Sequence, residues 1–165
     1  MATIRKATFP TDRSLVASLF QEYAHWLGED LCFQNFDDEL ASLPGKYREP
    51  AGTILLASDE REALGCVALR GQDGDVAEMK RLWVRPKARG AGTGASLVEA
   101  VERFAGEAGY AAIVLDTLER LDGALRLYEN HGYRRIGAYY HNPIPGAVYL
   151  RKDLREEPLS RTAER

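Results

Sequence analysis

A glycine-rich segment in the middle of the chain, Arg89-Gly90-Ala91-Gly92-Thr93-Gly94, carries the clearest chemical signal in the sequence. It follows a strand-like stretch that ends at Pro86, and it precedes a stretch with apolar residues at helical spacing. Glycine lets a backbone approach a ligand closely, and the N-terminus of a helix presents bare N–H groups that bind anions. Arg85 and Lys87 add positive charge beside Arg89. The segment therefore predicts a phosphate-bearing ligand held where the strand meets the helix.

Strands and helices must alternate around this segment to position it. The sequence predicts strands at Thr3–Ala7, Thr53–Ser58, Ala63–Arg70, Val76–Val84, Ala111–Asp116, Tyr133–Ala138 and Ala147–Asp153. It predicts helices from the Thr11-Asp12 turn to Leu27, over Phe36–Leu43, from the glycine-rich segment to an end within Gly106–Gly109, and over Leu121–His131. Because a strand, a helix and another strand follow one another around the glycines, the two strands should pair in parallel.

Other phosphate-binding and catalytic patterns fit the sequence less well. A mononucleotide P-loop ends in Gly-Lys-Ser/Thr, and a dinucleotide-binding fingerprint directly follows a first strand, whereas these glycines lie in mid-chain. The three histidines, His25, His131 and His141, are too scattered for a zinc site, and no Ser/His/Asp or Cys/His arrangement is readable. We therefore expect no metal.

Three features of the sequence resemble the GNAT superfamily of N-acetyltransferases. The pattern Arg-x-x-Gly-x-Gly, formed by Arg89, Gly92 and Gly94, is similar to the acyl-CoA pyrophosphate loop of that family. The run Ala124–Tyr133 resembles the family's A-x-x-L-Y-x-x-x-G-[FY] element, and Glu78 lies on the strand before the glycines, as in many members. The order of elements also matches the family over nearly the whole chain.

This resemblance implies an α/β (α+β) fold with a mixed, mostly antiparallel central sheet of about seven strands and helices on both faces. It also implies acetyl-CoA as co-substrate, with the strand before the glycines and the next strand splaying apart to bond the pantetheine amides. The residues placed against this cofactor are Leu82, Trp83, Val84, Arg89, Gly90, Ala91, Gly92, Thr93 and Gly94. Thr93 replaces a commoner aliphatic residue without affecting the backbone amide.

The implied reaction is direct transfer of the acetyl group from the thioester to an amine. An alkyl amine has a pKa of about 10.4, so it must lose a proton before it attacks. The resemblance makes Glu78 the base, acting through a water, and the Leu82 N–H the donor to the oxyanion. Tyr128 would donate to the leaving thiolate. From the residues alone, Glu78 could instead pair with Lys80, and Tyr128 could be a core aromatic residue.

The acceptor should lie between the loop after the first helix and the last hairpin. The residues that the resemblance places there are Phe33, Phe36, Tyr139, Tyr140 and Asn142. Carboxylates at Glu29, Asp30, Asp37 and Asp38 could attract a cationic amine, partly by cation–π contact with the aromatic rings. We expect a primary amine of a small molecule, amino acid or peptide. Two alternatives stay open, a non-catalytic acyl-CoA-binding sensor and a nucleotide-binding protein.

Length and composition set the remaining expectations. With 165 residues, we expect one N-acetyltransferase domain over 1–155 and a disordered polar tail over 156–165. The net charge of −3 indicates neither a nucleic-acid nor a membrane partner, and no apolar run is long enough to span a bilayer. Without an export signal, Cys32 and Cys66 should be buried free thiols of a cytoplasmic protein. A homodimer is compatible with these features.

Overall fold

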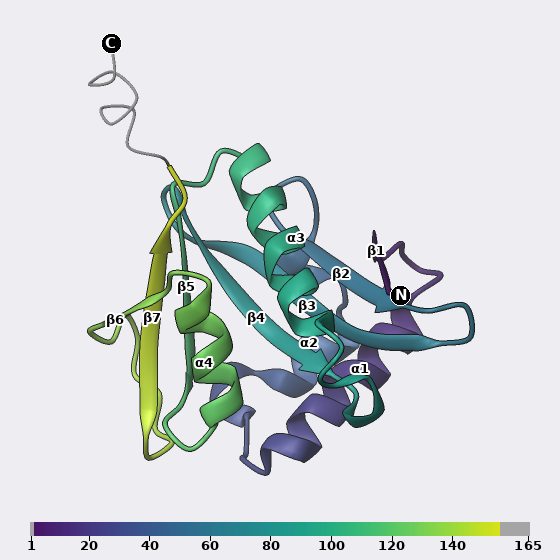
Figure 1. Ribbon diagram of the computed structural model, residues 1–165, viewed down its shortest axis with the longest axis horizontal. Helices are drawn as coiled ribbons and strands as arrows, with labels where there is room; N and C mark the ends of the chain where they lie inside the picture. The colour runs from purple at the N-terminus through teal and green to yellow at the C-terminus, as the bar shows by residue number, and fades with distance from the viewer. Residues whose placement is uncertain (1, 156–165) are drawn as a thin grey trace.

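A seven-stranded sheet forms the centre of the structure, a computed structural model that describes residues 2–155 (Figure 1). The strands are β1 (Thr3–Lys6), β2 (Thr53–Ser58), β3 (Ala63–Asp73), β4 (Val76–Val84), β5 (Ala112–Leu118), β6 (Arg134–Ile136) and β7 (Ala147–Asp153). They lie in the order β1-β2-β3-β4-β5-β7-β6. The segment 156–165, for which the sequence predicts a disordered tail, lies outside the described residues.

The pair of β4 and β5 is the one parallel pair among the described strands. It is short, because Val76–Glu78 pairs with Ala112–Val114 and the register ends there. All other neighbouring strands pair antiparallel. The sheet is therefore mixed and mostly antiparallel, which confirms the predicted fold class. Beyond Glu78 the two strands separate, as the family resemblance implies.

Two helices cover each face of the sheet (Figure 1). The helices α1 (Arg13–Leu27) and α2 (Phe36–Ala41) lie on one face, and α3 (Thr93–Glu107) and α4 (Asp122–Asn130) lie on the other. Buried residues of α1, among them Leu19 and Phe20, form a core with β2 and β3. Leu97 and Val101 of α3 form a second core with the opposite side of the same strands. The apolar stripes of the sequence are thus the faces that pack on the sheet.

Among the element boundaries that differ from the predicted ones, three have a local cause in the structure. Strand β3 continues through residues 71–73, where a turn is expected, because Gly74 with φ 58° makes a tight turn. Strand β6 begins only at Arg134, because the Tyr133 N–H bonds a carbonyl oxygen of α4 and closes the end of that helix. Helix α2 ends at Ala41, because the Ser42 N–H and hydroxyl both bond the same upstream carbonyl oxygen.

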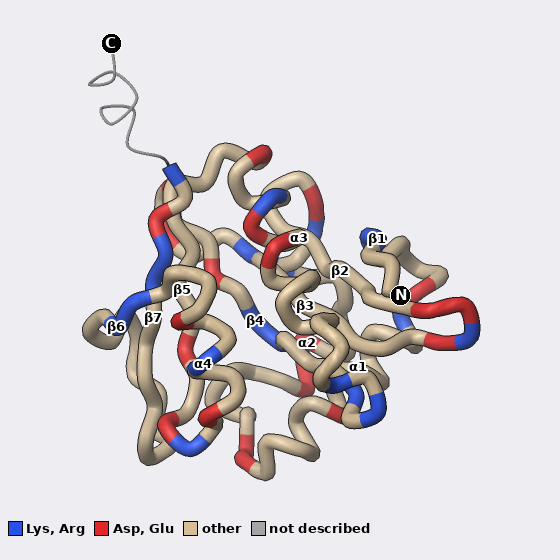
Figure 2. Tube along the Cα trace, in the orientation of Figure 1, with Lys and Arg blue, Asp and Glu red and all other residues tan. Residues whose placement is uncertain are grey.

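The two cysteines differ in exposure, and charged residues are spread along the chain. Cys66 is a buried free thiol, as predicted, whereas Cys32 is free but exposed in the short 3-10 turn η1 (Cys32–Gln34), so the prediction is wrong for Cys32. Figure 2 shows acidic and basic residues interspersed over most of the trace. Within residues 2–155, no helix has the length and apolarity that a membrane span requires.

Candidate active site

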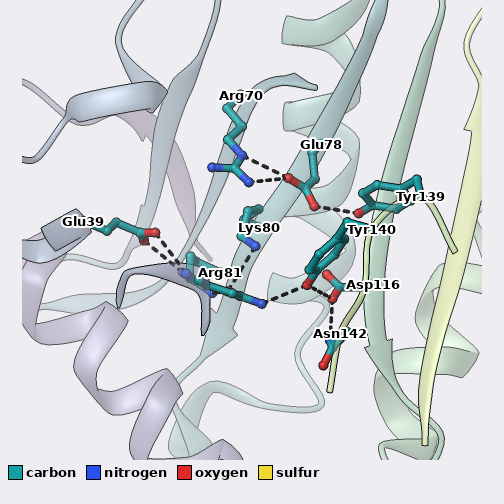
Figure 3. Close-up of polar contacts among 10 residues, drawn as sticks. Glu39, Arg70, Glu78, Lys80, Arg81, Asp116, Tyr139, Tyr140 and Asn142 are labelled. Carbon is teal, nitrogen blue, oxygen red and sulfur yellow. Dashed lines mark hydrogen bonds and ion pairs between the residues drawn. The ribbon is translucent and has the colours of Figure 1, made fainter. Parts of the chain in front are cut away.

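A bulge in β4 determines which side chains meet at the candidate site. Between Lys80 and Trp83, two residues stand opposite a single residue of β3, and they are Arg81 and Leu82. Arg81 has a φ of 61°, a left-handed conformation that is uncommon for a residue with a Cβ atom. A bulge interrupts the alternation of a strand. Glu78, Lys80 and Arg81 therefore all project to the face that carries α2 and η1 (Figure 3).

A first cavity of about 650 Å³ lies where β4 and β5 separate. Its walls come from the end of β4, the glycine-rich segment, the end of β5, and α4. Gly90 and Gly92 have φ values of 85° and 84°, which only glycine adopts readily. Gly92 is the residue that precedes α3. The turn thus places the N-terminus of α3 at the wall of this cavity.

Most residues that the sequence assigns to the cofactor line this first cavity. They are Leu82, Trp83, Val84, Arg89, Gly90, Gly92, Thr93 and Gly94. Ala91 is not among the lining residues, although it lies between two glycines that are. The assigned set is therefore gathered around one space, which extends from the bulge to the start of α3.

The cations beside the glycine-rich segment have different surroundings. The Arg89 guanidinium lies 5.0 Å from the ring centroid of Trp83 and 5.2 Å from that of Trp26, at the cavity wall. Arg85 and Lys87 form ion pairs with glutamates of α1 and of the β2–β3 turn, and neither lines the cavity. For these two residues the structure favours a surface ion pair over a phosphate contact.

Tyr128 reaches the first cavity from α4. Its side chain is 7% exposed, and its ring packs edge-on against Tyr133 with 5.8 Å between the centroids. Burial raises the pKa of the Tyr128 hydroxyl above its ordinary value, so the group stays protonated at neutral pH. The structure thus places a protonated hydrogen-bond donor in the cavity wall.

A second cavity of about 330 Å³ lies next to the first, and Lys80 and Gln34 line both. Glu78 lies in its wall with 1% of its surface exposed. One carboxylate oxygen accepts a hydrogen bond from Arg70 Nε at 2.9 Å, and the other accepts one from the Tyr139 hydroxyl at 2.6 Å (Figure 3). Glu78 is therefore an ion-pair partner, but of Arg70 across the β3–β4 ladder and not of Lys80.

Gln34 connects three polar side chains at the boundary of the two cavities. Its Oε1 accepts hydrogen bonds from Lys80 Nζ at 3.1 Å and Arg81 Nη1 at 2.8 Å, while its Nε2 donates to the Tyr140 hydroxyl at 3.1 Å. Lys80 is 7% exposed and forms no ion pair within residues 2–155. Burial and the charge of Arg81 lower the pKa of Lys80 to about 8.

Arg81 holds α2 against the bulge. Its side chain is 2% exposed, and Nε and Nη2 each donate to the Glu39 carboxylate at 2.9 Å (Figure 3). The ring of Phe36 lies 5.1 Å from the guanidinium. Contrary to its predicted place in the acceptor pocket, Phe36 lines neither of the two cavities, because its ring packs beside Arg81 and against the core under α1.

Asp116 on β5 organises the loop between β6 and β7. Its Oδ2 accepts hydrogen bonds from the Tyr140 hydroxyl and from Asn142 Nδ2, whereas its Oδ1 has no partner in the described part of the chain. Asp116 and Asn142 line the first cavity, and Phe33, Tyr139 and Tyr140 line the second. The predicted acceptor residues other than Phe36 are thus divided between two neighbouring cavities.

Comparison with known proteins assigns the family. Residues 15–133 match the model of the acetyltransferase (GNAT) family. The chain belongs to the GNAT family. A Schizosaccharomyces pombe protein described as an uncharacterized N-acetyltransferase is 45% identical over 154 residues, which cover 92% of this chain and 94% of that protein. N-acetylaspartate synthetase of Xenopus tropicalis is 33% identical over 103 residues, which cover 62% of this chain and 38% of that protein.

A solved structure supports the fold of this GNAT protein. A Salmonella typhimurium protein described as an acetyltransferase, solved with its cofactor acetyl-CoA, has a TM-score of 0.73 and 16% identity, and the match covers 94% of this chain and 95% of that one. The resemblance read from Arg89, the glycines and Tyr128 therefore identifies the family correctly. Within residues 2–155, the structure contains no group of three or more His, Cys, Asp or Glu residues that could hold a metal ion.

The sequence does not assign a role to four polar residues of this GNAT site, Gln34, Arg70, Lys80 and Asp116. The sequence contains a sign that two of them are unusual, because Arg70 and Asp116 each follow apolar strand residues that pack in the core. A charged residue within an otherwise apolar, buried strand is unusual, because charged side chains are seldom buried. Lys80 is hidden within a run of basic residues, and Gln34 lies in an irregular loop, where no sequence period applies.

Proposed function

We propose that this GNAT protein moves an acetyl group from acetyl-CoA to a primary amine of a small molecule, amino acid or peptide by direct attack. One observation carries the proposal. The first cavity combines a helix N-terminus with two separating strands, and it shares Lys80 and Gln34 with a second, polar cavity. The two spaces suit a phosphate-bearing thioester and an amine that meet at their boundary.

The first cavity offers the groups that acetyl-CoA requires. Pairing between β4 and β5 ends at Glu78, so backbone groups beyond this point are available for the pantetheine amides. The N–H groups of residues 90–94, at the start of α3, would bind the pyrophosphate. Arg89 adds a fixed positive charge at the same wall. These features are the physical basis for acetyl-CoA as co-substrate.

Two donors would act on the reacting thioester. Leu82 lies in the bulge without a register partner on β3, and its N–H would donate to the acetyl oxygen as negative charge develops there. Tyr128 would donate to the leaving sulfur. A phenol of pKa about 10 is a weaker acid than a thiol of about 8.5. Burial raises the Tyr128 pKa further, so we expect a hydrogen bond to the thiolate and not full proton transfer.

We propose Glu78 as the group that takes the proton of the amine, with Asp116 as the alternative. Leu82 lies four positions after Glu78, at most roughly 13 Å along β4, so Glu78 would act through a water or through the hydroxyl of Tyr139. Asp116 lies at the wall of the first cavity and has one carboxylate oxygen without a partner in the described residues. The position of Asp116 at the first cavity therefore favours it as the base, whereas the family resemblance favours Glu78 in that role.

The relatives make an amine acceptor reasonable without defining it. The name of the Xenopus relative refers to N-acetylaspartate, which makes an amino acid one candidate acceptor for this chain. The alternative is a non-catalytic acyl-CoA sensor, and the presence of Tyr128 in the first cavity supports turnover instead. A cytoplasmic location and a homodimer stay predictions of the sequence.

Calorimetric titration and a thiol-release assay together test the proposed function. We expect acetyl-CoA to bind, ATP not to bind, and at least one primary amine in a broad panel to release CoA above the hydrolysis background. Binding of acetyl-CoA without turnover of any amine would favour the sensor. Binding of ATP in place of acetyl-CoA would exclude the acetyltransferase proposal.

Two matched variants identify the base. If Glu78 accepts the proton, Glu78→Gln should lower kcat/KM by about 100-fold or more. Asp116→Asn should then have a much smaller effect on kcat/KM. The opposite ranking of the two variants would assign the proton transfer to Asp116.

A further inference from the structure

The second cavity is lined by more positive than negative side chains. Its positively charged residues are Lys46, Arg70 and Lys80, and its negatively charged residues are Glu39 and Glu78. Both carboxylates are already engaged, because Glu39 pairs with the buried Arg81 and Glu78 pairs with Arg70. A ligand in this cavity therefore meets a surplus of positive charge.

Each of the three cations keeps donors for a ligand. Lys46 forms no hydrogen bond or ion pair within residues 2–155, and Arg70 uses Nε and Nη2 on Glu78 but leaves Nη1 free of described partners (Figure 3). The ammonium group of Lys80 has one bond, to the neutral amide of Gln34. A buried charge without an opposite charge is unfavourable, because burial removes its hydration. The lowered pKa of Lys80 reflects this cost.

We propose that the second cavity binds the acceptor through a carboxylate, so that the acetylated amine belongs to a molecule that also carries a carboxylate group, as amino acids do. A carboxylate among Lys46, Arg70 and Lys80 would supply the missing opposite charge and accept charge-assisted hydrogen bonds. An amine without an anionic group would bring a further positive charge into the same space and is disfavoured.

The boundary residues also give the acceptor an orientation. Lys80 lines both cavities, so a carboxylate at its ammonium group leaves the neighbouring amine at the boundary, next to the first cavity. This step rests on the proposed function, because the amine must meet a thioester held in the first cavity. The acidic residues that the sequence suggests as attractors for a cationic amine, Glu29, Asp30, Asp37 and Asp38, are not among the residues that line the second cavity.

The experiment measures acetylation of matched acceptors by the full-length protein. The probes are the amino acids, their α-carboxamides, the corresponding decarboxylated amines, glutamate against glutamine, and spermidine. We expect kcat/KM to be at least about tenfold higher for the best carboxylate-bearing amine than for its neutral counterpart, which corresponds to about 1.4 kcal/mol. The lower pKa of an α-carboxamide amine favours the neutral probe, so the comparison is a stringent one.

Charge variants locate the effect in the second cavity. Lys46→Glu and Lys80→Met should each raise KM for the carboxylate-bearing acceptor at least about tenfold, and Lys46→Glu, at a residue that does not line the first cavity, should leave the affinity for acetyl-CoA unchanged. Arg103→Glu is the control, because Arg103 is an exposed cation of α3 that lines neither cavity. We expect it to leave KM unchanged.

The outcomes separate this inference from the proposed function. Equal or better acetylation of decarboxylated amines or spermidine would overturn the carboxylate site while acetyl transfer stands. If no amine is acetylated, ligand-observed NMR with CoA-loaded protein tests whether the second cavity binds amino acids. Binding of amino acids that Lys46→Glu abolishes would support the carboxylate site even though acetyl transfer fails, and absence of any such binding would overturn it.

Discussion

At the scale of single residues, Lys80 is a lysine held almost without water in a wall shared by two cavities. Its pKa falls from an ordinary 10.5 to about 8 on folding. Between these two pH values the unfolded chain binds more protons than the folded one, so stability rises with pH in this window. Below about pH 8, Lys80 is charged in both the folded and the unfolded state, and the free-energy cost of burying this charge is at its largest.

Lys80→Met should therefore be more stable than the wild type near pH 7, and this advantage should shrink as the pH rises towards 10. The slope of the difference is at most about 1.4 kcal/mol per pH unit. Urea unfolding of both proteins at several pH values measures it. Lys46→Met, in an exposed lysine, is the matched control and should show no such slope. A pH-independent difference for Lys80→Met would show that this lysine is not desolvated.

Tyr128 differs from its neighbour Tyr133 in what its hydroxyl reaches. Tyr128→Phe should lower kcat about 10- to 100-fold, because the leaving thiolate loses a donor, with little change in acetyl-CoA affinity. Tyr133→Phe is the control, since this ring packs on Tyr128 but lines neither cavity. Steady-state kinetics and calorimetry measure the two effects. An unchanged kcat in Tyr128→Phe would return Tyr128 to a purely structural role.

At the scale of elements, the Arg81–Glu39 pair joins α2 to the bulge of β4. The exposed fractions of the two side chains are 2% and 13%. Glu39→Gln would leave a buried guanidinium without its opposite charge, and we expect a loss of about 3–5 kcal/mol in the free energy of unfolding. Glu22→Gln breaks a more exposed pair, with 23% for Arg85 and 38% for Glu22, and should cost less than about 1 kcal/mol.

Urea denaturation of the two glutamine variants measures both losses under one condition. Equal losses would mean that burial does not strengthen the Arg81–Glu39 pair. A large loss in Glu39→Gln alone would show that the buried ion pair between α2 and the bulge stabilises the fold.

The sequence predicts the elements well and the polar site only in part, for a physical reason. The spacing of apolar residues in helices and strands repeats over a few neighbouring positions. The apolar stripe of α1 and the apolar run of β5 can therefore be recognised in the sequence. The bulge at Arg81 depends on the register of β4 against β3, which no local pattern specifies, and it occurs without a glycine. The surroundings of Lys80 depend in turn on that bulge and on Gln34, from a distant turn.

At the scale of the whole molecule, the strands β1–β4 and the strands β5–β7 are joined through one short parallel pairing that ends at Glu78. A ligand in the first cavity would contact both groups of strands. Acetyl-CoA at about 100 times its Kd should stabilise the fold by about 2.7 kcal/mol, which is roughly 5–10 °C in Tm. Scanning calorimetry with acetyl-CoA and with ATP measures this. An equal rise with ATP would contradict a specific acetyl-CoA site.

The bulge also divides β4 into two segments whose side chains alternate between the two faces of the sheet in opposite phase. Before it, Met79 packs in the core under α3, and after it Leu82 and Val84 pack on that core while Trp83 packs on the other. Straightening the bulge without removing a residue would exchange the faces of everything on one side of it, whereas deleting Arg81 would restore a regular ladder but remove this side chain from the site. The number of residues in this strand is therefore as constrained as their types. The effects of substitutions are comparable only between residues on the same side of the bulge.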